Sequence, residues 1–283
     1  MRRAPAPGRA HRRVDLHLHT IFSDGTLTPE ELVARALSLQ LAAIALTDHD
    51  TMDGLERART RAAGEPLELV PALELSTLLD NANLHLLGYY VDPQHEPLLL
   101  RLAEFREERR ERARCMVEKL RALGVPLDVE DVFRIAAPGA VGRPHVAEAL
   151  VRAGHARDPD DAFRRYVGYR APAYVPRTGF SPAQAIQLVH AAGGVPVLAH
   201  PGSLRRDDLI PSLVEQGLRG IEVWHPNHDA GSVRRYREAA ERYDLIATGG
   251  SDYHGPQRGY EMGEQPVPVS VLNALKAAAG VSG

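Results

Sequence analysis

The chain has 283 residues, of which 44% are hydrophobic and 25% charged, and its formal net charge is −3 at pH 7. This composition is typical of a globular protein, and the length suffices for one large barrel or two ordinary domains. A single cysteine, Cys115, excludes an internal disulfide and a metal site built from several thiolates.

The first 13 residues carry five arginines and contain no apolar stretch of the kind that a signal peptide requires. We interpret residues 1–13 as a disordered basic tail. No apolar run in the chain approaches the roughly 20 residues needed to span a bilayer. These features favour a cytoplasmic enzyme or binding protein that has no contact with the membrane.

Short apolar runs rich in β-forming residues alternate with helical stretches over residues 14–94 and 178–283. We expect seven strands, at 14–20, 41–47, 67–74, 84–90, 195–200, 220–224 and 245–248. Thr28 and Ser181 each precede a proline, and Glu31 and Gln184 follow three residues later, which predicts two capped helix starts. The alternation predicts an α/β fold of parallel strands and crossover helices, a seven-stranded (β/α)7 relative of the TIM barrel.

Residues 95–177 lack this alternation and carry 16 basic against 13 acidic residues. A long charged helix over 98–123 is followed by shorter helical stretches, so we predict an inserted helical domain over 95–177. The run at 106–112 intersperses both signs of charge at helical spacing. This pattern favours a solvated, salt-paired helix face over a nucleic-acid-binding stripe.

Nine His, Asp and Glu residues lie in or just beyond these apolar runs. They are His17, His19, Asp24, His49, Glu74, His85, His200, Asp252 and His254. Each has an ordinary explanation on its own: a half-exposed strand for the first two, a loop for His49, an arginine partner for Glu74, and a core position for His85. Because barrel active sites form where strands end, their recurrence favours one shared metal site made of imidazole and carboxylate.

The surrounding motifs resemble those of the polymerase and histidinol phosphatase (PHP) family. They are residues 17–19, 23–25, 46–51, 74, 85–89, 199–202 and 250–255. Within that family, Gly142-Arg143-Pro144-His145 and the segment 172–176 resemble the branch of nucleoside 3′,5′-bisphosphate phosphatases that also act as 5′-to-3′ exoribonucleases. Where that branch has Gly-Lys-Pro, this chain has Arg170-Ala171-Pro172, which moves the positive charge to Arg170.

The resemblance implies a distorted seven-stranded barrel that holds two or three divalent ions. His17, His19, Glu74 and Asp252 would hold one ion, Glu74, His85 and His200 a second, and Asp24, His49 and His254 a third. Mixed imidazole and carboxylate ligands suit Mn²⁺, Zn²⁺ or Fe²⁺ better than Ca²⁺, and we expect Mn²⁺. Arg143, His145 and Arg170 would bind a substrate phosphate, although Arg143 and His145 also fit a loop followed by a capped helix.

Three further residues have two interpretations each. His225 and His228 lie beyond a predicted strand, where one could protonate a leaving alkoxide or both could belong to a polar loop. Asp15 could orient a histidine ligand or serve as a buried capping carboxylate.

The resemblance implies that the substrate is a nucleoside 3′,5′-bisphosphate or a short 5′-phosphorylated RNA, and it implies no obligate protein partner. A histidinol phosphate phosphatase is the alternative enzyme. A noncatalytic PHP module that accompanies a polymerase is the alternative of a different class.

Overall fold

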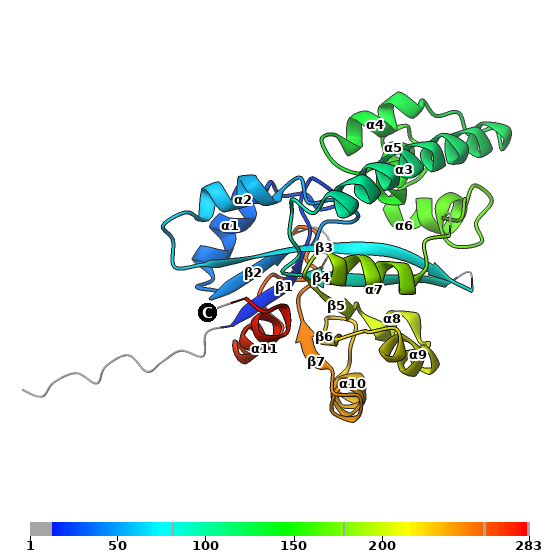
Figure 1. Cartoon of the computed structure of the whole chain (residues 1–283). Helices are drawn as coiled ribbons and strands as arrows, with labels where there is room; N and C mark the ends of the chain where they lie inside the picture. The colour runs from blue at the N-terminus through cyan, green and yellow to red at the C-terminus, as the bar shows by residue number, and fades with distance from the viewer. Residues whose placement is uncertain (1–12, 81, 178, 257–258, 282–283) are drawn as a thin grey trace, which may run out of the picture.

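The computed structural model describes residues 13–80, 82–177, 179–256 and 259–281. Most of the predicted tail therefore lies outside the described residues, but Arg13 forms an isolated β-bridge with Pro268. One sheet contains all seven predicted strands in chain order (Figure 1). They are β1 Val14–Leu18, β2 Ala43–Leu46, β3 Glu68–Leu79, β4 Ala82–Tyr89, β5 Val195–Leu198, β6 Gly220–Trp224 and β7 Ile246–Gly249.

The prediction that all strands run parallel is wrong for β4, which pairs antiparallel with both β3 and β5. Two residues separate β3 from β4, whereas a parallel crossover needs a dozen or more. The two strands therefore form a hairpin, and β4 begins at the barrel end where the parallel strands finish. A bridge between Leu18 and Tyr253 joins the last segment to the first strand and nearly closes the barrel.

Helices pack around the strands as α/β alternation requires. They are α1 Pro29–Ser38, α2 Leu55–Ala62, α7 Pro182–Ala191, α8 Pro201–Leu204, the 3₁₀ helix η2 Asp207–Leu209, α9 Ile210–Glu215, α10 Ala230–Arg242 and α11 Ser270–Ala279. The capping boxes predicted at Thr28 and Ser181 are confirmed at the starts of α1 and α7. Within the described ranges, no helix is both long and apolar enough to cross a membrane.

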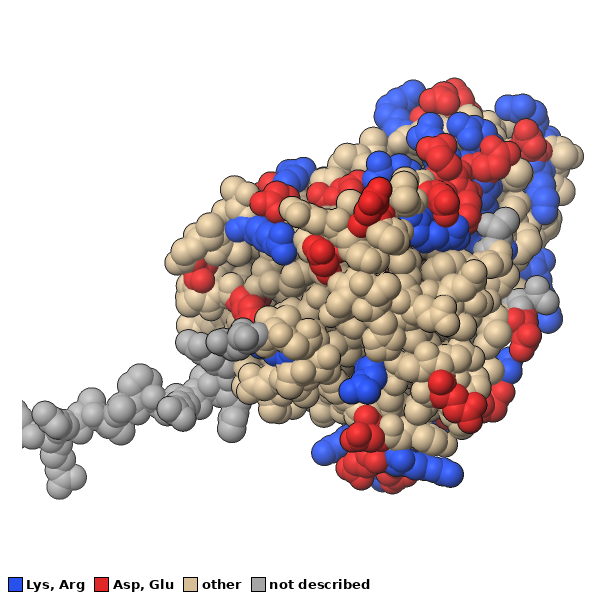
Figure 2. Space-filling view, in the orientation of Figure 1, with Lys and Arg blue, Asp and Glu red and all other residues tan. Residues whose placement is uncertain are grey.

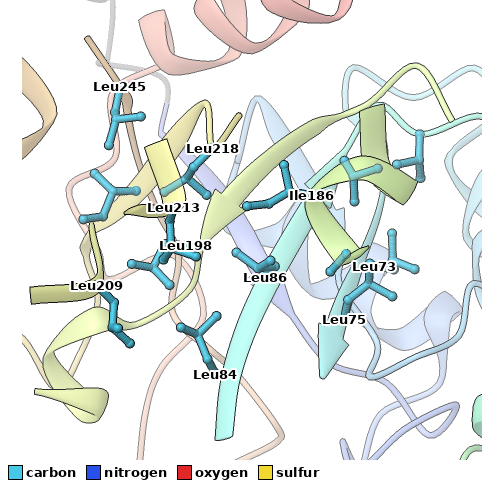
Figure 3. Packing of buried hydrophobic residues seen from close by; sticks show 14 of the residues in the cluster. Leu73, Leu75, Leu84, Leu86, Ile186, Leu198, Leu209, Leu213, Leu218 and Leu245 are labelled. Carbon is cyan, nitrogen blue, oxygen red and sulfur yellow. The ribbon is translucent and has the colours of Figure 1, made fainter. Parts of the chain in front are cut away.

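The alternation of side chains along β3 divides it between two apolar clusters. Leu73 and Leu75 pack outward, with Leu84 and Leu86 of β4 and Ile186 of α7 (Figure 3). Val70 and Ala72 face the second cluster, which takes residues from β1 to β5 and from α11. Because strand side chains alternate with period two, Glu74 shares the inner face of Val70 and Ala72.

The predicted helical insertion lies on one side of the barrel (Figure 1). It comprises α3 Glu96–Ala122, α4 Val129–Ala136, α5 Arg143–Arg152, α6 Pro159–Ala162 and the π-helix η1 Phe163–Val167. A separate apolar cluster that runs from Ala113 to Ala173 forms its core. The first half of α3 packs on the barrel instead, through Leu98, Leu102 and Phe105. The domain limits at 95 and 177 stay a prediction.

A buried carboxylate ties α3 to the barrel. Asp50, just after β2, accepts hydrogen bonds from Arg109 Nε at 2.9 Å and from Arg177 Nη1 at 3.1 Å. The interpretation of residues 106–112 as a solvated, salt-paired face is therefore wrong in part, since Arg109 and Arg112 are only 7% and 9% exposed. Elsewhere on the insertion, basic and acidic side chains intermix at the surface (Figure 2).

Replacement of Asp50 by asparagine is expected to lower the free energy of unfolding by about 3 to 5 kcal/mol, because the buried guanidinium of Arg109 and the partly buried one of Arg177 lose their carboxylate. Urea denaturation measures this change. Asp53→Asn is the matched control, since the Asp53–Arg106 pair also joins this loop to α3 but its side chains are 46% and 53% exposed. The control should cost less than about 1 kcal/mol. Equal effects of the two substitutions would contradict the anchoring role of Asp50.

Candidate metal centre

The nine predicted ligands converge at the barrel end where the parallel strands finish. Eight of the nine form three groups, each with all its ligand atoms within 4.8 Å of one another, and the ninth, His200, contacts Glu74. The groups are His17, His19 and Asp252; His49, Glu74 and His85; and His19, Asp24, His49 and His254. The antiparallel course of β4 explains how His85 joins them, because the start of that strand lies at the same end. Which ligands share an ion stays a prediction.

Glu74 occupies the centre of the cluster and is 1% exposed. Its Oε2 lies 3.3 Å from His17 Nε2 and 3.3 Å from His19 Nε2. Its Oε1 lies 2.7 Å from His85 Nδ1 and 3.0 Å from His200 Nε2. The two oxygens of one carboxylate thus face two different sets of histidines, which is the arrangement that a bridging ligand requires.

Asp252 and Asp24 supply carboxylates on the other side of the cluster. Asp252 Oδ1 lies 3.3 Å from His17 Nε2 and 3.2 Å from His19 Nε2. Asp24 Oδ1 lies 3.2 Å from His254 Nε2 and 3.8 Å from His49 Nε2. Each aspartate places one oxygen atom near three imidazoles, since Asp252 Oδ1 also lies 3.5 Å from His254 Nδ1 and Asp24 Oδ1 lies 4.0 Å from His19 Nδ1.

Two observations indicate that these residues fit divalent metal ions. His19 Nε2, His49 Nδ1 and Asp24 Oδ1 are buried, and their close contacts lack the geometry of hydrogen bonds within the described chain, although unsatisfied buried polar atoms are costly. His200 and Asp252 also adopt φ of 27° and 48°, a left-handed conformation that is uncommon for non-glycine residues and is often found at ligand-binding sites. Shared cations would satisfy the unpaired atoms.

Glu222 is a supporting residue that sequence reasoning did not assign. Its Oε1 accepts from His17 Nδ1 at 3.0 Å, and its Oε2 accepts from the backbone N–H of His200 at 2.7 Å. Such a carboxylate fixes the tautomer and orientation of a ligating imidazole. A glutamate within the apolar run of β6 was the signal available in the sequence. Asp15 instead accepts from the backbone N–H groups of Ser251 and Gly263, so it is a capping carboxylate.

His225 and His228 both have partners within the chain, and their role as proton donors stays a prediction. His225 Nδ1 accepts from the backbone N–H of Asn227 at 3.1 Å, and its Nε2 lies 3.3 Å from Asp252 Oδ2. His228 Nδ1 donates a hydrogen bond to the carbonyl of Val223, and its Nε2 accepts one from the backbone N–H of Gly202. His225 therefore positions Asp252, and His228 holds two loops together.

Metal binding by this cluster should release protons. Burial lowers the pKa of His19, but Asp252 and Glu74 outweigh this effect and raise the pKa to about 10. An imidazole with this pKa is protonated at pH 7 and must lose its proton to bind a cation. We therefore expect the apparent affinity for Mn²⁺ to rise with pH. Titration calorimetry in buffers of different ionisation enthalpy measures the proton release, and a buffer-independent heat would contradict it.

A cavity of about 100 Å³ adjoins the metal centre beneath the insertion, and we call it the arginine pocket. Its lining includes Arg109, Arg112, Arg143 and Arg177 together with Asp24, His49 and His85. Burial, assisted by the positive charges of Arg177 and Arg143, lowers the pKa of Arg112 to about 9. Such a concentration of guanidinium groups favours an anionic ligand, and the phosphate group matches their bidentate geometry.

Of the three predicted phosphate-binding residues, the structure places Arg143 in this pocket. Its guanidinium lies 5.7 Å from the ring centroids of both Phe163 and Tyr174. His145 Nδ1 accepts from the backbone N–H of Gly142 at 2.9 Å, so this histidine caps α5. Arg170 does not line the pocket; it is exposed, with its guanidinium 5.2 Å from the ring centroid of Tyr169. Arg109, Arg112 and Arg177 line the pocket beside Arg143, and whether Arg143, His145 and Arg170 bind a phosphate stays a prediction.

Comparisons with known proteins agree with this geometry. A PHP domain matches residues 15–111. The 5′-3′ exoribonuclease Rnm of Escherichia coli is 35% identical over 260 residues, which cover 89% of this chain and 88% of that protein. The 3′,5′-nucleoside bisphosphate phosphatase of Chromobacterium violaceum is 35% identical over 255 residues, which cover 87% and 88% of the two chains.

Among solved structures, a protein of Bifidobacterium adolescentis described as a metal-dependent phosphoesterase superposes with a TM-score of 0.88. The two sequences are 33% identical, and the match covers 95% of this chain and 97% of that one. The resemblance drawn from the sequence motifs is thereby confirmed. The chain belongs to the PHP family of metal-dependent phosphoesterases, in the group that contains this exoribonuclease and this bisphosphate phosphatase.

Proposed function

We propose that the protein hydrolyses the 3′-phosphate ester of 5′-phosphorylated nucleotides. It acts both as a nucleoside 3′,5′-bisphosphate phosphatase and as a 5′-to-3′ exoribonuclease on short 5′-monophosphorylated RNA. The observation that carries this proposal is the arginine pocket, which shares Asp24, His49 and His85 with the metal centre. A 5′ phosphate held by the arginines leaves the 3′ phosphate of the same nucleotide beside the metal ligands.

The residues divide the work between binding and chemistry. When bound, divalent ions would supply Lewis acidity and would lower the pKa of water, so that a nucleophile for phosphorus forms near neutral pH. Glu74 bridges the two sets of histidines, and Glu222 holds the ring of His17 in the orientation that presents Nε2. Arg143 binds the 5′ phosphate and thereby positions the reacting phosphate at the metal ligands. The reaction then requires no side-chain nucleophile.

One reaction accounts for both activities. In a bisphosphate, hydrolysis of the bond between phosphorus and the 3′ oxygen releases inorganic phosphate and leaves a nucleoside 5′-monophosphate. In a 5′-phosphorylated RNA, the first internucleotide phosphate occupies the same 3′ position. The same bond cleavage then releases a nucleoside 5′-monophosphate and leaves a new 5′ phosphate, so that repetition shortens the RNA from its 5′ end.

The finer parts of this proposal follow from donor chemistry. Mn²⁺ is the expected metal, with Zn²⁺ and Fe²⁺ as alternatives, because the ligand set mixes imidazoles with carboxylates. A cytoplasmic location and the absence of an obligate protein partner remain predictions. Histidinol phosphate, the alternative substrate, carries one phosphate and would leave the arginine pocket without a role. A noncatalytic module would need no pocket beside its metal ligands.

Competition between the two substrates tests the shared site. The Mn²⁺-loaded protein should convert end-labelled 5′-phosphorylated RNA to nucleoside 5′-monophosphates from the 5′ end, and a 5′-hydroxyl RNA should be a poor substrate. A nucleoside 3′,5′-bisphosphate should inhibit this reaction with an inhibition constant equal to its own KM. Shortening from the 3′ end would contradict the proposal, and so would preferred hydrolysis of histidinol phosphate. Full metal content without turnover would favour the noncatalytic module.

A further inference from the structure

A second cavity, of about 380 Å³, opens on the other side of His85. His85 and His200 of the metal centre form one wall, and Tyr169, just after η1, belongs to another. We call it the Tyr169 cavity. Its volume lies in the range of small-molecule sites. Asn83 and His85 line both this cavity and the arginine pocket, so the two spaces adjoin at the metal centre.

The lining of the Tyr169 cavity suits an uncharged ring better than a phosphate. It includes the apolar side chains of Leu84 and Leu204 and the carboxylate of Asp80, and none of its described lining residues is Lys or Arg. Tyr169 is 55% exposed, and its ring contacts Tyr174 edge to face with centroids 5.6 Å apart. A largely exposed aromatic ring that a second ring supports can serve as a stacking platform for a nucleobase.

A polar atom at the junction of the two cavities also lacks a partner. The side-chain oxygen of Asn83 is buried and accepts no hydrogen bond from the described part of the chain. A buried acceptor without a donor is costly. The exocyclic amine of a base or the 2′-hydroxyl of a ribose would supply the missing donor. Both groups belong to a nucleotide that passes from one cavity to the other.

Chain polarity assigns the cavity to a particular nucleotide. According to the proposed function, the 5′ phosphate lies in the arginine pocket and the reacting phosphate lies at the metal centre. The RNA therefore continues past His85 and His200, away from the arginines. We propose that the Tyr169 cavity binds the nucleotide on the 3′ side of the cleaved bond, with its base stacked on Tyr169. Arg170, whose guanidinium lies 5.2 Å from the Tyr169 ring centroid, is placed to meet the next phosphate.

The inference rests on the proposed function and predicts a difference between its two substrates. A nucleoside 3′,5′-bisphosphate has no nucleotide on the 3′ side of the cleaved bond, whereas RNA does. Tyr169→Ala should therefore lower the ratio of kcat/KM for 5′-phosphorylated RNA to kcat/KM for the bisphosphate, by roughly 5- to 100-fold. Tyr169→Phe, which keeps the ring, should preserve the ratio.

A substrate with one missing base separates stacking from other effects. When the second nucleotide of the RNA is abasic, Tyr169→Ala and the wild type should cleave it equally well, because no base remains to stack. An equal loss with RNA and bisphosphate would place the first nucleotide in the cavity and overturn the inference, and an unchanged ratio would also overturn it. Failure of the wild type to hydrolyse either substrate would instead overturn the proposed function itself, and the inference with it.

Discussion

Glu74→Ala is expected to lower phosphoester hydrolysis by at least about 10³-fold, the several kcal/mol that a catalytic metal contributes to transition-state stabilisation. The physical reason is the position of its carboxylate. Oε1 faces His85 and His200 while Oε2 faces His17 and His19, so removal of one side chain disturbs two groups of ligands. Both the phosphatase and the exoribonuclease activities should fall together.

Elemental analysis distinguishes this bridging role from that of an ordinary ligand. Glu74→Ala should lose more metal per chain than Asp24→Ala, because the described contacts of Asp24 involve one of its oxygens and a single set of histidines. Glu68→Ala is a control on the same strand, since Glu68 pairs with Lys276 away from the cluster. It should retain metal and activity. An equal loss of metal from the Glu74 and Asp24 variants would contradict the bridge.

Arg143→Ala is expected to lower kcat/KM for a nucleoside 3′,5′-bisphosphate roughly 30- to 1000-fold. This factor corresponds to a loss of about 2 to 4 kcal/mol of transition-state binding. The loss arises because the partly buried guanidinium of Arg143 no longer holds the 5′ phosphate. Metal content should stay normal. A nucleoside 3′-monophosphate has no 5′ phosphate, so its hydrolysis should be much less sensitive to the substitution.

Arg152→Ala provides the matched control, because Arg152 ends the same helix that Arg143 begins and its side chain is 65% exposed in a pair with Glu148. This variant should hydrolyse both substrates as the wild type does. If Arg143→Ala left kcat/KM for the bisphosphate unchanged, the start of α5 would be a structural cap and the arginine pocket would not bind the 5′ phosphate.

The sequence determined those features whose causes are local. Seven apolar runs are sufficient to predict seven strands, because strand length and β-propensity depend on neighbouring residues. Thr28 and Ser181 predict their helix starts because a capping box closes within one turn. The convergence of the nine candidate ligands could be predicted because strand ends meet at one rim of a barrel.

The tertiary structure decided what depends on partners distant in the chain. The direction of β4 follows from the two-residue link after β3, which overrides the general alternation of strands and helices. Arg109 looks like part of a solvated helix face until Asp50, 59 residues earlier, is seen to pair with it. Glu222 orients His17 across 205 residues, and His225 positions Asp252. The periodicity of a helix or strand predicts which of its side chains share a face, but not which residues of other elements contact that face. These roles could therefore be assigned only from the tertiary structure.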